Sequence, residues 1–272
     1  MRKIYLLLFA AFFWFAGCNS NDTARKQLEE ARRLYENAQY GSAKQSLDTL
    51  KTHYPNDLDL QKDILRLMRE IELKEQMRNL AFCDSLLPIR QAEAGAMKPF
   101  FLFEKTEYDS EGRYMDKSWN PSVESGFVGI KTNVTESRDL VLTAFYRSAT
   151  PLRYNRLKVA IPSGEYTETQ SISFDGGANY TFKDSNGTNY EIVTFQQGRD
   201  NGVMAFIYAY AKEKITMEYA GGKKVPTRLL SQQEKDALVR TVNFATLLKE
   251  TEQLSEQKEK TGKRIQYLQS KL

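Results

Sequence analysis

The chain contains few of the residues from which metal centres and nucleophilic active sites are usually built. Among its 272 residues there are one histidine, His53, and two cysteines. A zinc site draws on about four ligands, mainly Cys and His. A Ser-His-Asp triad would need His53, which no G-x-S-x-G motif accompanies. We interpret His53 as a partner of the last carbonyls of a predicted helix. The sequence therefore predicts no metal, no cofactor and no enzymatic activity.

Carboxylates are the remaining candidates for catalysis, and an enzyme acting on glycans would need two of them close together in a cleft. Candidates in the region that we predict to be β are Glu104, Glu107, Asp109, Asp116, Asp175 and Glu191. Their order along the chain does not show whether any two converge. We interpret them as solvated surface groups and keep an enzyme that acts on envelope glycans as an alternative.

Charge of one sign is not in large excess. The formal net charge of +4 becomes +2 once the two charges of Arg2 and Lys3 are subtracted, and acids are interspersed with the remaining bases. No basic stripe carries the interleaved aromatics that are typical of nucleic-acid binding. We therefore predict that nucleic acid is not a partner.

Long apolar runs are absent beyond the first 17 residues. The longest run, Ile4–Ala16, has thirteen residues and follows the positive charges of Arg2 and Lys3. A helix that spans a bilayer needs about 20 apolar residues, so this run is too short. Its length and its charged flank are typical of a signal peptide, which we place at residues 1–17.

The apolar run ends in Phe15-Ala16-Gly17-Cys18, which resembles the lipobox of bacterial lipoproteins, with Phe15 in place of the usual Leu. The resemblance implies that Cys18 carries a diacylglycerol and that its new amino group is acylated, for which palmitate is expected. Three acyl chains would anchor the protein firmly, since one chain alone binds only marginally. By the same resemblance, Asn19 favours the outer membrane; whether the protein faces the periplasm or the exterior stays open. Under this interpretation the second cysteine has no disulfide partner.

Residues 18–98 have the apolar period of helices. A helix–turn–helix ends before Pro55, and its second helix begins at Tyr40. The spacing is similar to one tetratricopeptide repeat, a unit that needs a neighbour to bury its apolar face. The residues that fit this pattern are Ala31, Leu34, Tyr40, Ala43, Leu47, Leu50 and Pro55, whereas Gln27 stands where that family prefers Trp. A further helix begins after Asn56 or Asp57 and runs to about Leu87. Pro88 is expected to end or kink it, and Gly95 with Pro99 to close the helical region.

Residues 99–228 alternate with period two and are rich in β-branched and aromatic residues. Turn signals separate the alternating runs, of which Asn186-Gly187 is the strongest hairpin signal. Eight to ten short strands of this kind predict an antiparallel β-sandwich. The alternating positions are Leu140, Leu142, Ala144 and Tyr146; Ile172 and Phe174; Tyr180 and Phe182; Tyr190 and Ile192; Met204, Phe206 and Tyr208; and Ile215, Met217 and Tyr219.

Residues 229–272 are predicted to form a long helix that begins at a capping box of Ser231 and Glu234. Its apolar seam is that of a weak coiled coil. We expect it to pair antiparallel with the N-terminal helices, with the β-sandwich inserted between them. The predicted fold class is therefore α+β, with N-terminal helical hairpins and a long C-terminal helix flanking an antiparallel β-sandwich.

These features favour a lipid-anchored envelope protein that acts as a non-enzymatic scaffold for an envelope protein partner. The alternative is a surface glycan-binding module. Ten of the fifteen tyrosines fall between Tyr108 and Tyr219, and Trp119 is the one tryptophan outside the signal peptide. Trp119 and Tyr114 are the predicted contacts for a sugar ring or a protein partner. The competing interpretation is that most of these aromatic side chains fill the core of the sandwich or line its rim.

Overall fold

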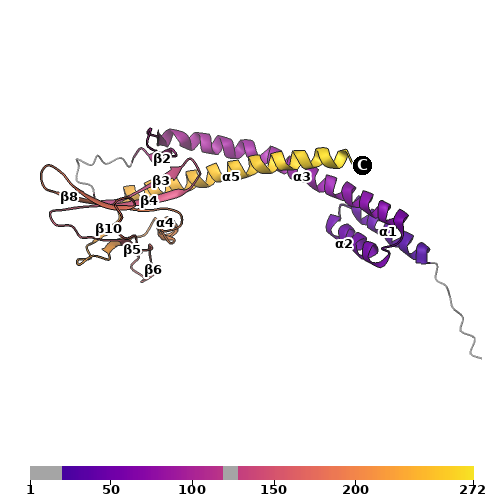
Figure 1. The fold of residues 1–272 in the computed structure, drawn as a ribbon, viewed down its shortest axis with the longest axis horizontal. Coiled ribbons are helices and arrows are strands. Elements are labelled where there is room, and N and C mark those ends of the chain that lie inside the picture. The colour runs from indigo at the N-terminus through magenta and orange to yellow at the C-terminus, as the bar shows by residue number, and fades with distance from the viewer. Residues whose placement is uncertain (1–19, 119–127) are drawn as a thin grey trace, which may run out of the picture. The chain divides into compact units, whose positions relative to one another are not determined.

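The computed structural model describes residues 20–118 and 128–272 (Figure 1). Their contacts divide into two compact units. The helical unit contains residues 20–84 and 257–272, and the β unit contains residues 85–256. The described residues form five α-helices and two antiparallel sheets, so the predicted α+β fold class is confirmed.

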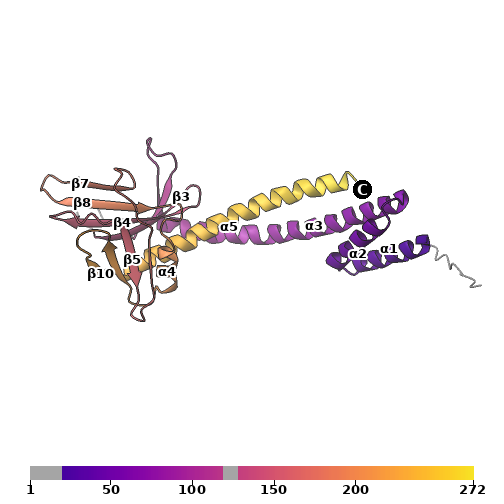
Figure 2. The same ribbon diagram turned by 60° about the horizontal axis from the view of Figure 1, so that its bottom comes forward.

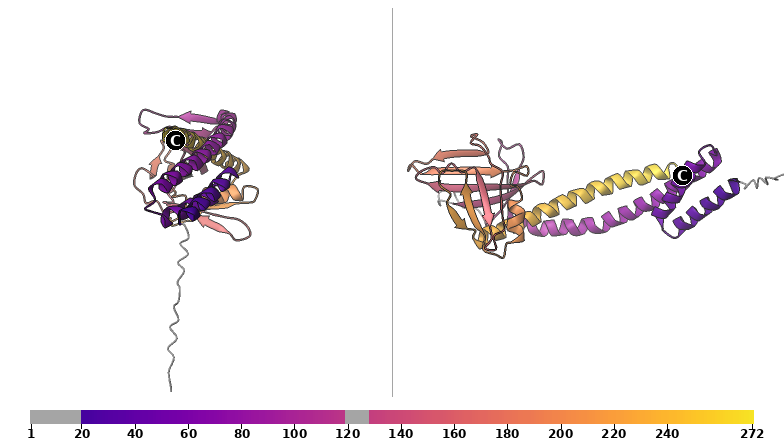
Figure 3. Two further views of the ribbon diagram at one scale, coloured as in Figure 1. Left: turned by 90° about the vertical axis from the view of Figure 1, so that its right-hand side faces the viewer. Right: turned by 90° about the horizontal axis from the view of Figure 1, so that it is seen from below.

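The helical unit is built from α1 (Ser20–Glu36), α2 (Tyr40–His53), the first part of α3 (Leu58–Met97) and the last part of α5 (Gln232–Gln269). These are the indigo and violet helices, with the yellow end of α5, in Figures 1 and 3. The predicted starts and stops are confirmed, since α2 begins at Tyr40 and ends before Pro55, and Asp57 caps α3 by accepting the Leu60 N–H at 3.1 Å. The buried side chains of this unit are Ala24, Leu28, Ala31, Ala43, Leu47, Leu50, Leu60, Ile64, Leu67 and Ile71.

The prediction that α3 runs only to about Leu87 is wrong, because the helix passes through Pro88 and ends at Met97. A proline removes the one hydrogen bond that its missing N–H would donate to the carbonyl four residues earlier. The apolar stripe of α3 continues through this position, with Cys83, Leu87 and Ala94 all buried. Packing along that stripe offsets the lost hydrogen bond. The short 3₁₀ turn Lys98–Phe100 then closes the region as predicted.

Helices α3 and α5 run antiparallel within each unit. In the helical unit, the Arg264 guanidinium donates to both oxygens of Glu72 at 2.6 and 2.7 Å, and Lys258 Nζ lies 2.7 Å from Asp84. The later residue on α3, Asp84, pairs with the earlier residue on α5, Lys258, so the two helices run in opposite directions. In the β unit, Arg90 Nε of α3 lies 3.0 Å from Glu250 of α5, and Met97 at the end of α3 packs against the cluster that contains Phe244 and Ala245 of α5.

The β unit contains a six-stranded and a four-stranded sheet, both antiparallel. The six-stranded sheet has the order β1 (Phe101–Glu104), β2 (Arg113–Asp116), β3 (Gly129–Thr135), β4 (Leu140–Ser148), β8 (Asn189–Phe195) and β7 (Asn179–Lys183). The four-stranded sheet has the order β10 (Thr227–Leu229), β9 (Thr216–Ala220), β5 (Arg156–Ala160) and β6 (Tyr166–Glu168). Figure 2 shows β5 running steeply across the direction of β7 and β8.

One hydrophobic core lies between the two sheets, which makes the β unit a sandwich. Leu142, Ala144 and Phe195 contribute from the six-stranded sheet, and Leu157 and Met217 from the four-stranded sheet. The predicted hairpin at Asn186-Gly187 is confirmed, because the segment joins β7 to β8.

Two of the predicted strands are wrong. Residues Val203–Ala209 form helix α4, not a strand that includes Met204 and Phe206. The Asp200 carboxylate accepts the N–H of Met204 at 3.3 Å, and Val203, Met204 and Ile207 are buried together, as the helical period requires. Residues 170–178 form no strand, although Ile172 is buried in the core.

The start of α5 confirms the predicted capping box. The Ser231 N–H donates to Glu234 Oε2 at 2.8 Å, and the Glu234 N–H donates to Ser231 Oγ at 3.2 Å. Glu234 is only 2% exposed and has two further partners. Its carboxylate accepts the N–H of Ile130 on β3 at 3.2 Å and pairs with the guanidinium of Arg228 on β10. The cap therefore ties α5 to both sheets.

Replacing Glu234 by alanine is expected to destabilise the protein by about 3–5 kcal/mol, because it leaves the half-buried guanidinium of Arg228 without an acidic partner and the N–H groups of Ile130 and Ser231 without that acceptor. Ser231→Ala removes the cap hydroxyl alone and is expected to lower the free energy of unfolding by only about 1 kcal/mol. Urea titration followed by circular dichroism measures both. Equal losses in the two variants would contradict the role assigned to Glu234.

Candidate functional site

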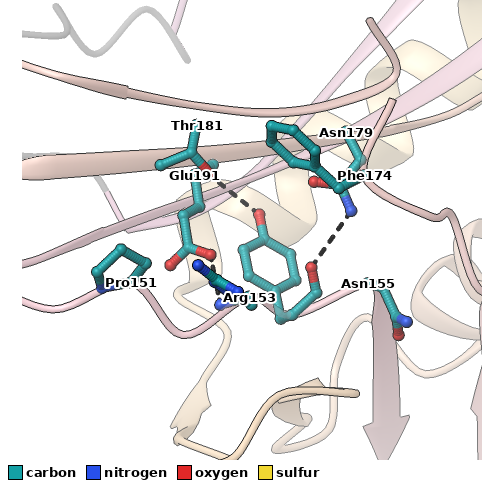
Figure 4. A pocket seen from close by; sticks show the side chains of 8 residues that line it. Pro151, Arg153, Asn155, Phe174, Asn179, Thr181 and Glu191 are labelled. Atoms are coloured by element: carbon teal, nitrogen blue, oxygen red, sulfur yellow. Dashed lines mark hydrogen bonds between the residues drawn. The ribbon is translucent and has the colours of Figure 1, made fainter. Parts of the chain in front are cut away.

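The best-defined pocket of the β unit lies beside β7, the edge strand of the six-stranded sheet, and its neighbour β8 (Figure 4). Its volume is about 370 Å³, near the lower limit of typical small-molecule sites. Two strands and two crossing segments supply the walls: β7, β8, the chain between β4 and β5, and the chain between β6 and β7. The lining residues are Pro151, Arg153, Tyr154, Asn155, Phe174, Asn179, Thr181 and Glu191.

Glu191 is the central polar group of this pocket. It lies on β8 opposite Thr181 of β7, on the face of the sheet that points toward the core, and is 2% exposed. Its two oxygens accept the N–H groups of Leu152 and Arg153, each at 2.6 Å. Arg153 has a positive φ of 58°, and this backbone turn aims two successive N–H groups at one anion. The carboxylate thus holds the crossing segment against β8.

Burial governs the ionisation of the groups around the pocket. Burial raises the pKa of Glu191, while the N–H donors of Leu152 and Arg153 and the positive charge of Arg153 oppose that rise. Burial also raises the pKa of Tyr154 well above its ordinary value. Its hydroxyl donates to the Ala144 carbonyl at 2.8 Å, so Tyr154 stays protonated and serves as a structural link to β4.

The remaining lining groups provide amide, hydroxyl and aromatic surfaces. Asn179 is buried, and its Nδ2 donates to the Ile172 carbonyl at 2.7 Å, which fixes the segment that carries Phe174. Phe174 is 69% exposed. Figure 4 shows Glu191 beside Thr181 and pointing toward Pro151 and Arg153, with Phe174 and Asn179 on the other side of the pocket.

The chemistry of the pocket suits binding. Among the described residues that line the pocket, Glu191 is the one carboxylate, whereas glycoside hydrolysis requires a pair of acids. Among residues 20–118 and 128–272, no group of three or more His, Cys, Asp or Glu side chains is arranged to hold a metal ion. What the pocket offers is one buried acceptor, one guanidinium, two amides, a hydroxyl and aromatic rings.

Of the residues predicted as site residues, Tyr114 alone belongs to the described part of the chain, and it does not line this pocket. Tyr114 lies on β2, half-buried between Phe103, at a ring distance of 4.8 Å, and Phe244, which it meets edge-on at 5.4 Å. Trp119 and Cys18 lie outside the described residues. The sequence offers Glu191 only as one of six candidate carboxylates in the β region. The signal that distinguishes it is a charged residue between Tyr190 and Ile192 in an alternating strand.

A second surface with mixed chemistry lies on the helical unit, between α2 and α3. The groove has a volume of about 480 Å³. The Arg78 guanidinium lies 5.9 Å from the centre of the Tyr40 ring, and Lys44 Nζ lies 2.8 Å from Glu75 at the same place. The residues that line this groove are Ala38, Tyr40, Gly41, Glu75, Gln76, Arg78 and Asn79. We call it the α2–α3 groove.

The raised pKa of Glu191 predicts a specific pH dependence of stability. Between the pKa of Glu in the unfolded chain, about 4.3, and the raised value in the folded chain, the folded state binds more protons. The contribution of this group to stability is therefore fully present below pH 4.3 or so and is lost as the pH rises through the raised pKa.

Glu191→Gln removes this titration, so the free energy of unfolding of the parent minus that of the variant is expected to increase as the pH falls from about 7 to about 4. Denaturant titrations of both proteins across this range measure the difference. Taking the difference cancels the carboxylates whose pKa is lowered, such as Glu72 and Asp184. A difference that shrinks on acidification would show that Glu191 is not held in a desolvated site.

No protein-family model matches this chain, and no curated protein and no solved structure matches it. Within the described part of the chain, no helix is both long enough and apolar enough to cross a membrane.

Proposed function

We propose that the protein is a non-enzymatic interaction scaffold of the cell envelope, anchored in the outer membrane by lipid on Cys18. The lipobox-like end of the signal sequence supports the anchor. The α2–α3 groove is the single structural observation that supports the scaffold role, because it combines an aromatic ring, a guanidinium and an opposite charge on solvent-accessible helices.

The chemistry of the α2–α3 groove is that of a protein-docking surface. Tyr and Arg are, with Trp, the residue types enriched among side chains that dominate binding energy, and here the Arg78 guanidinium lies over the Tyr40 ring. Lys44 and Glu75 bring both signs of charge to the rim of the groove, which favours one orientation of a partner. An envelope protein with a charged and aromatic surface is the partner that we propose.

Site-specific photo-crosslinking in intact cells tests the docking surface. Gly41 lines the groove and has open space where a side chain would begin, so Gly41→p-benzoylphenylalanine is expected to give one dominant protein adduct. Gly262 of α5 has equally open space outside the groove and provides the matched control. Arg78→Glu is expected to abolish the adduct formed from position 41. The same set of adducts from both positions, unchanged by Arg78→Glu, would contradict a docking role for the groove.

The anchor has a separate test. Cys18→Ala removes the thiol to which a diacylglycerol would attach, so most of the protein is expected to move from the membrane fraction to the soluble fraction. Fractionation followed by immunoblotting measures the shift. Because three acyl chains are replaced by none, full retention on membranes would show that the anchor is not a lipid on Cys18.

A second candidate function is favoured by the pocket around Glu191: binding of a surface glycan by the β unit. Sugars present hydroxyl groups at their edges and C–H groups on their ring faces. The pocket matches both, with Glu191, Asn179 and Thr181 as polar groups and Phe174 as an exposed ring. This function is compatible with the scaffold because the two sites lie in different units.

A further inference from the structure

We propose that the pocket around Glu191 binds a sugar residue that carries a carboxylate, as a uronic acid does, and that Arg153 recognises the acid. This inference rests on the second candidate function, glycan binding by the β unit. It goes further by naming the chemical class of the sugar and the residue that selects it.

The position of Arg153 allows its guanidinium to bind a carboxylate. Its backbone N–H is held by Glu191 at 2.6 Å and its φ is 58°, so the point from which its side chain leaves the backbone is fixed. Its guanidinium forms no ion pair or hydrogen bond with the described residues, whereas Arg228, Arg240 and Arg264 all pair with acids. An exposed, unpaired guanidinium on a pocket wall can bind a carboxylate through two parallel hydrogen bonds.

The inner wall of the pocket is suited to hydroxyl groups. An ionised carboxylate has about four acceptor positions, and Glu191 uses two of them for Leu152 and Arg153. The Oδ1 atom of Asn179 accepts no hydrogen bond from the described residues, and the hydroxyl of Thr181 can both donate and accept. Sugar hydroxyls can donate to the first two groups and exchange hydrogen bonds with the third.

Phe174 supplies the surface for the face of the sugar ring. Its side chain is 69% exposed, although it belongs to a segment held in place by the bond from Asn179 to Ile172. Exposed aromatic rings in fixed segments stack on apolar ring faces. At about 370 Å³ the pocket has room for one sugar residue rather than for a long oligosaccharide, which points to a glycan terminus.

A zwitterionic amino acid is the main competing ligand, because it could place its ammonium on Glu191 and its carboxylate on Arg153. The structure favours the sugar. Glu191 is almost completely buried, and bringing an ammonium ion to it would require a second charge to lose its water. A hydroxyl group donates the same hydrogen bond without that cost. An amino acid also leaves the exposed ring of Phe174 without a role.

Isothermal titration of the purified full-length chain with methyl β-D-glucuronide, methyl β-D-glucoside and glycine tests the proposal. The glucuronide is expected to bind about tenfold or more tightly than the glucoside, since only the glucuronide forms the charged pair. Arg153→Gln is expected to lower the affinity for the glucuronide to that for the glucoside. Arg153→Lys, which keeps the charge but not the planar pair of donors, is expected to lie between the two.

Two matched variants separate the pocket from general effects. Arg199→Gln removes the same charge from an exposed position outside the pocket and is expected to leave all affinities unchanged. Phe174→Ala is expected to lower the affinity for both sugars about tenfold. Phe182→Ala removes a ring that is 38% exposed on the opposite face of β7. This variant is expected to bind both sugars with unchanged affinity. Circular dichroism of each variant confirms that it is folded.

The outcomes distinguish this inference from the function on which it rests. If the glucoside binds as tightly as the glucuronide, or if Arg153→Gln leaves the glucuronide unaffected, recognition of the acid is wrong although glycan binding survives. If neither sugar binds, or if glycine binds more tightly than both, the inference and the glycan-binding function are both wrong. None of these results bears on the α2–α3 groove.

Discussion

A single buried carboxylate, that of Glu234, connects three elements of the β unit. It closes the N-terminal cap of α5 with Ser231, accepts a backbone N–H of β3 in the six-stranded sheet, and pairs with Arg228 of β10 in the four-stranded sheet. A buried charge is strongly unfavourable unless it is fully paired, so its partners must all be in place in the folded state. The helix start and the meeting of the two sheets therefore depend on one another.

A second buried carboxylate, that of Glu191, also accepts backbone N–H groups, but it lies at the pocket. Its donors come from a segment that crosses the face of β7 and β8. Because the carboxylate holds that segment in place, a pocket remains beside it, and the guanidinium of Arg153 stays exposed on the wall. Glu234 uses its hydrogen bonds to close an interface, whereas Glu191 uses them to hold a crossing segment beside a pocket. Pre-organisation of this kind lowers the ordering that a ligand must impose.

Much of the local structure followed from patterns of a few residues. The caps at Asp57 and Ser231, the start of α2 at Tyr40 and the hairpin at Asn186-Gly187 depend on contacts between near neighbours, which a sequence displays directly. The errors at Pro88 and at α4 have the opposite origin. An apolar stripe buried on both sides of Pro88 offsets one missing hydrogen bond. At Val203–Ala209, a short apolar run fits both the helical period of 3.6 and the strand period of two. Its tertiary contacts determine which residues are buried and therefore which structure forms.

The fold class, the paired helices and the antiparallel strands can be predicted from the chain alone, because they depend on period, capping and local motifs. Which polar residues meet depends on tertiary contacts. Arg153, Phe174 and Glu191 come from three separate segments, and nothing in their spacing indicates that they line one pocket. The sequence predicts Tyr114 as a contact residue, and the fold adds that its half-buried ring meets Phe244 edge-on. A binding site is a set of distances across the chain, and those distances exist only once the sheets have paired.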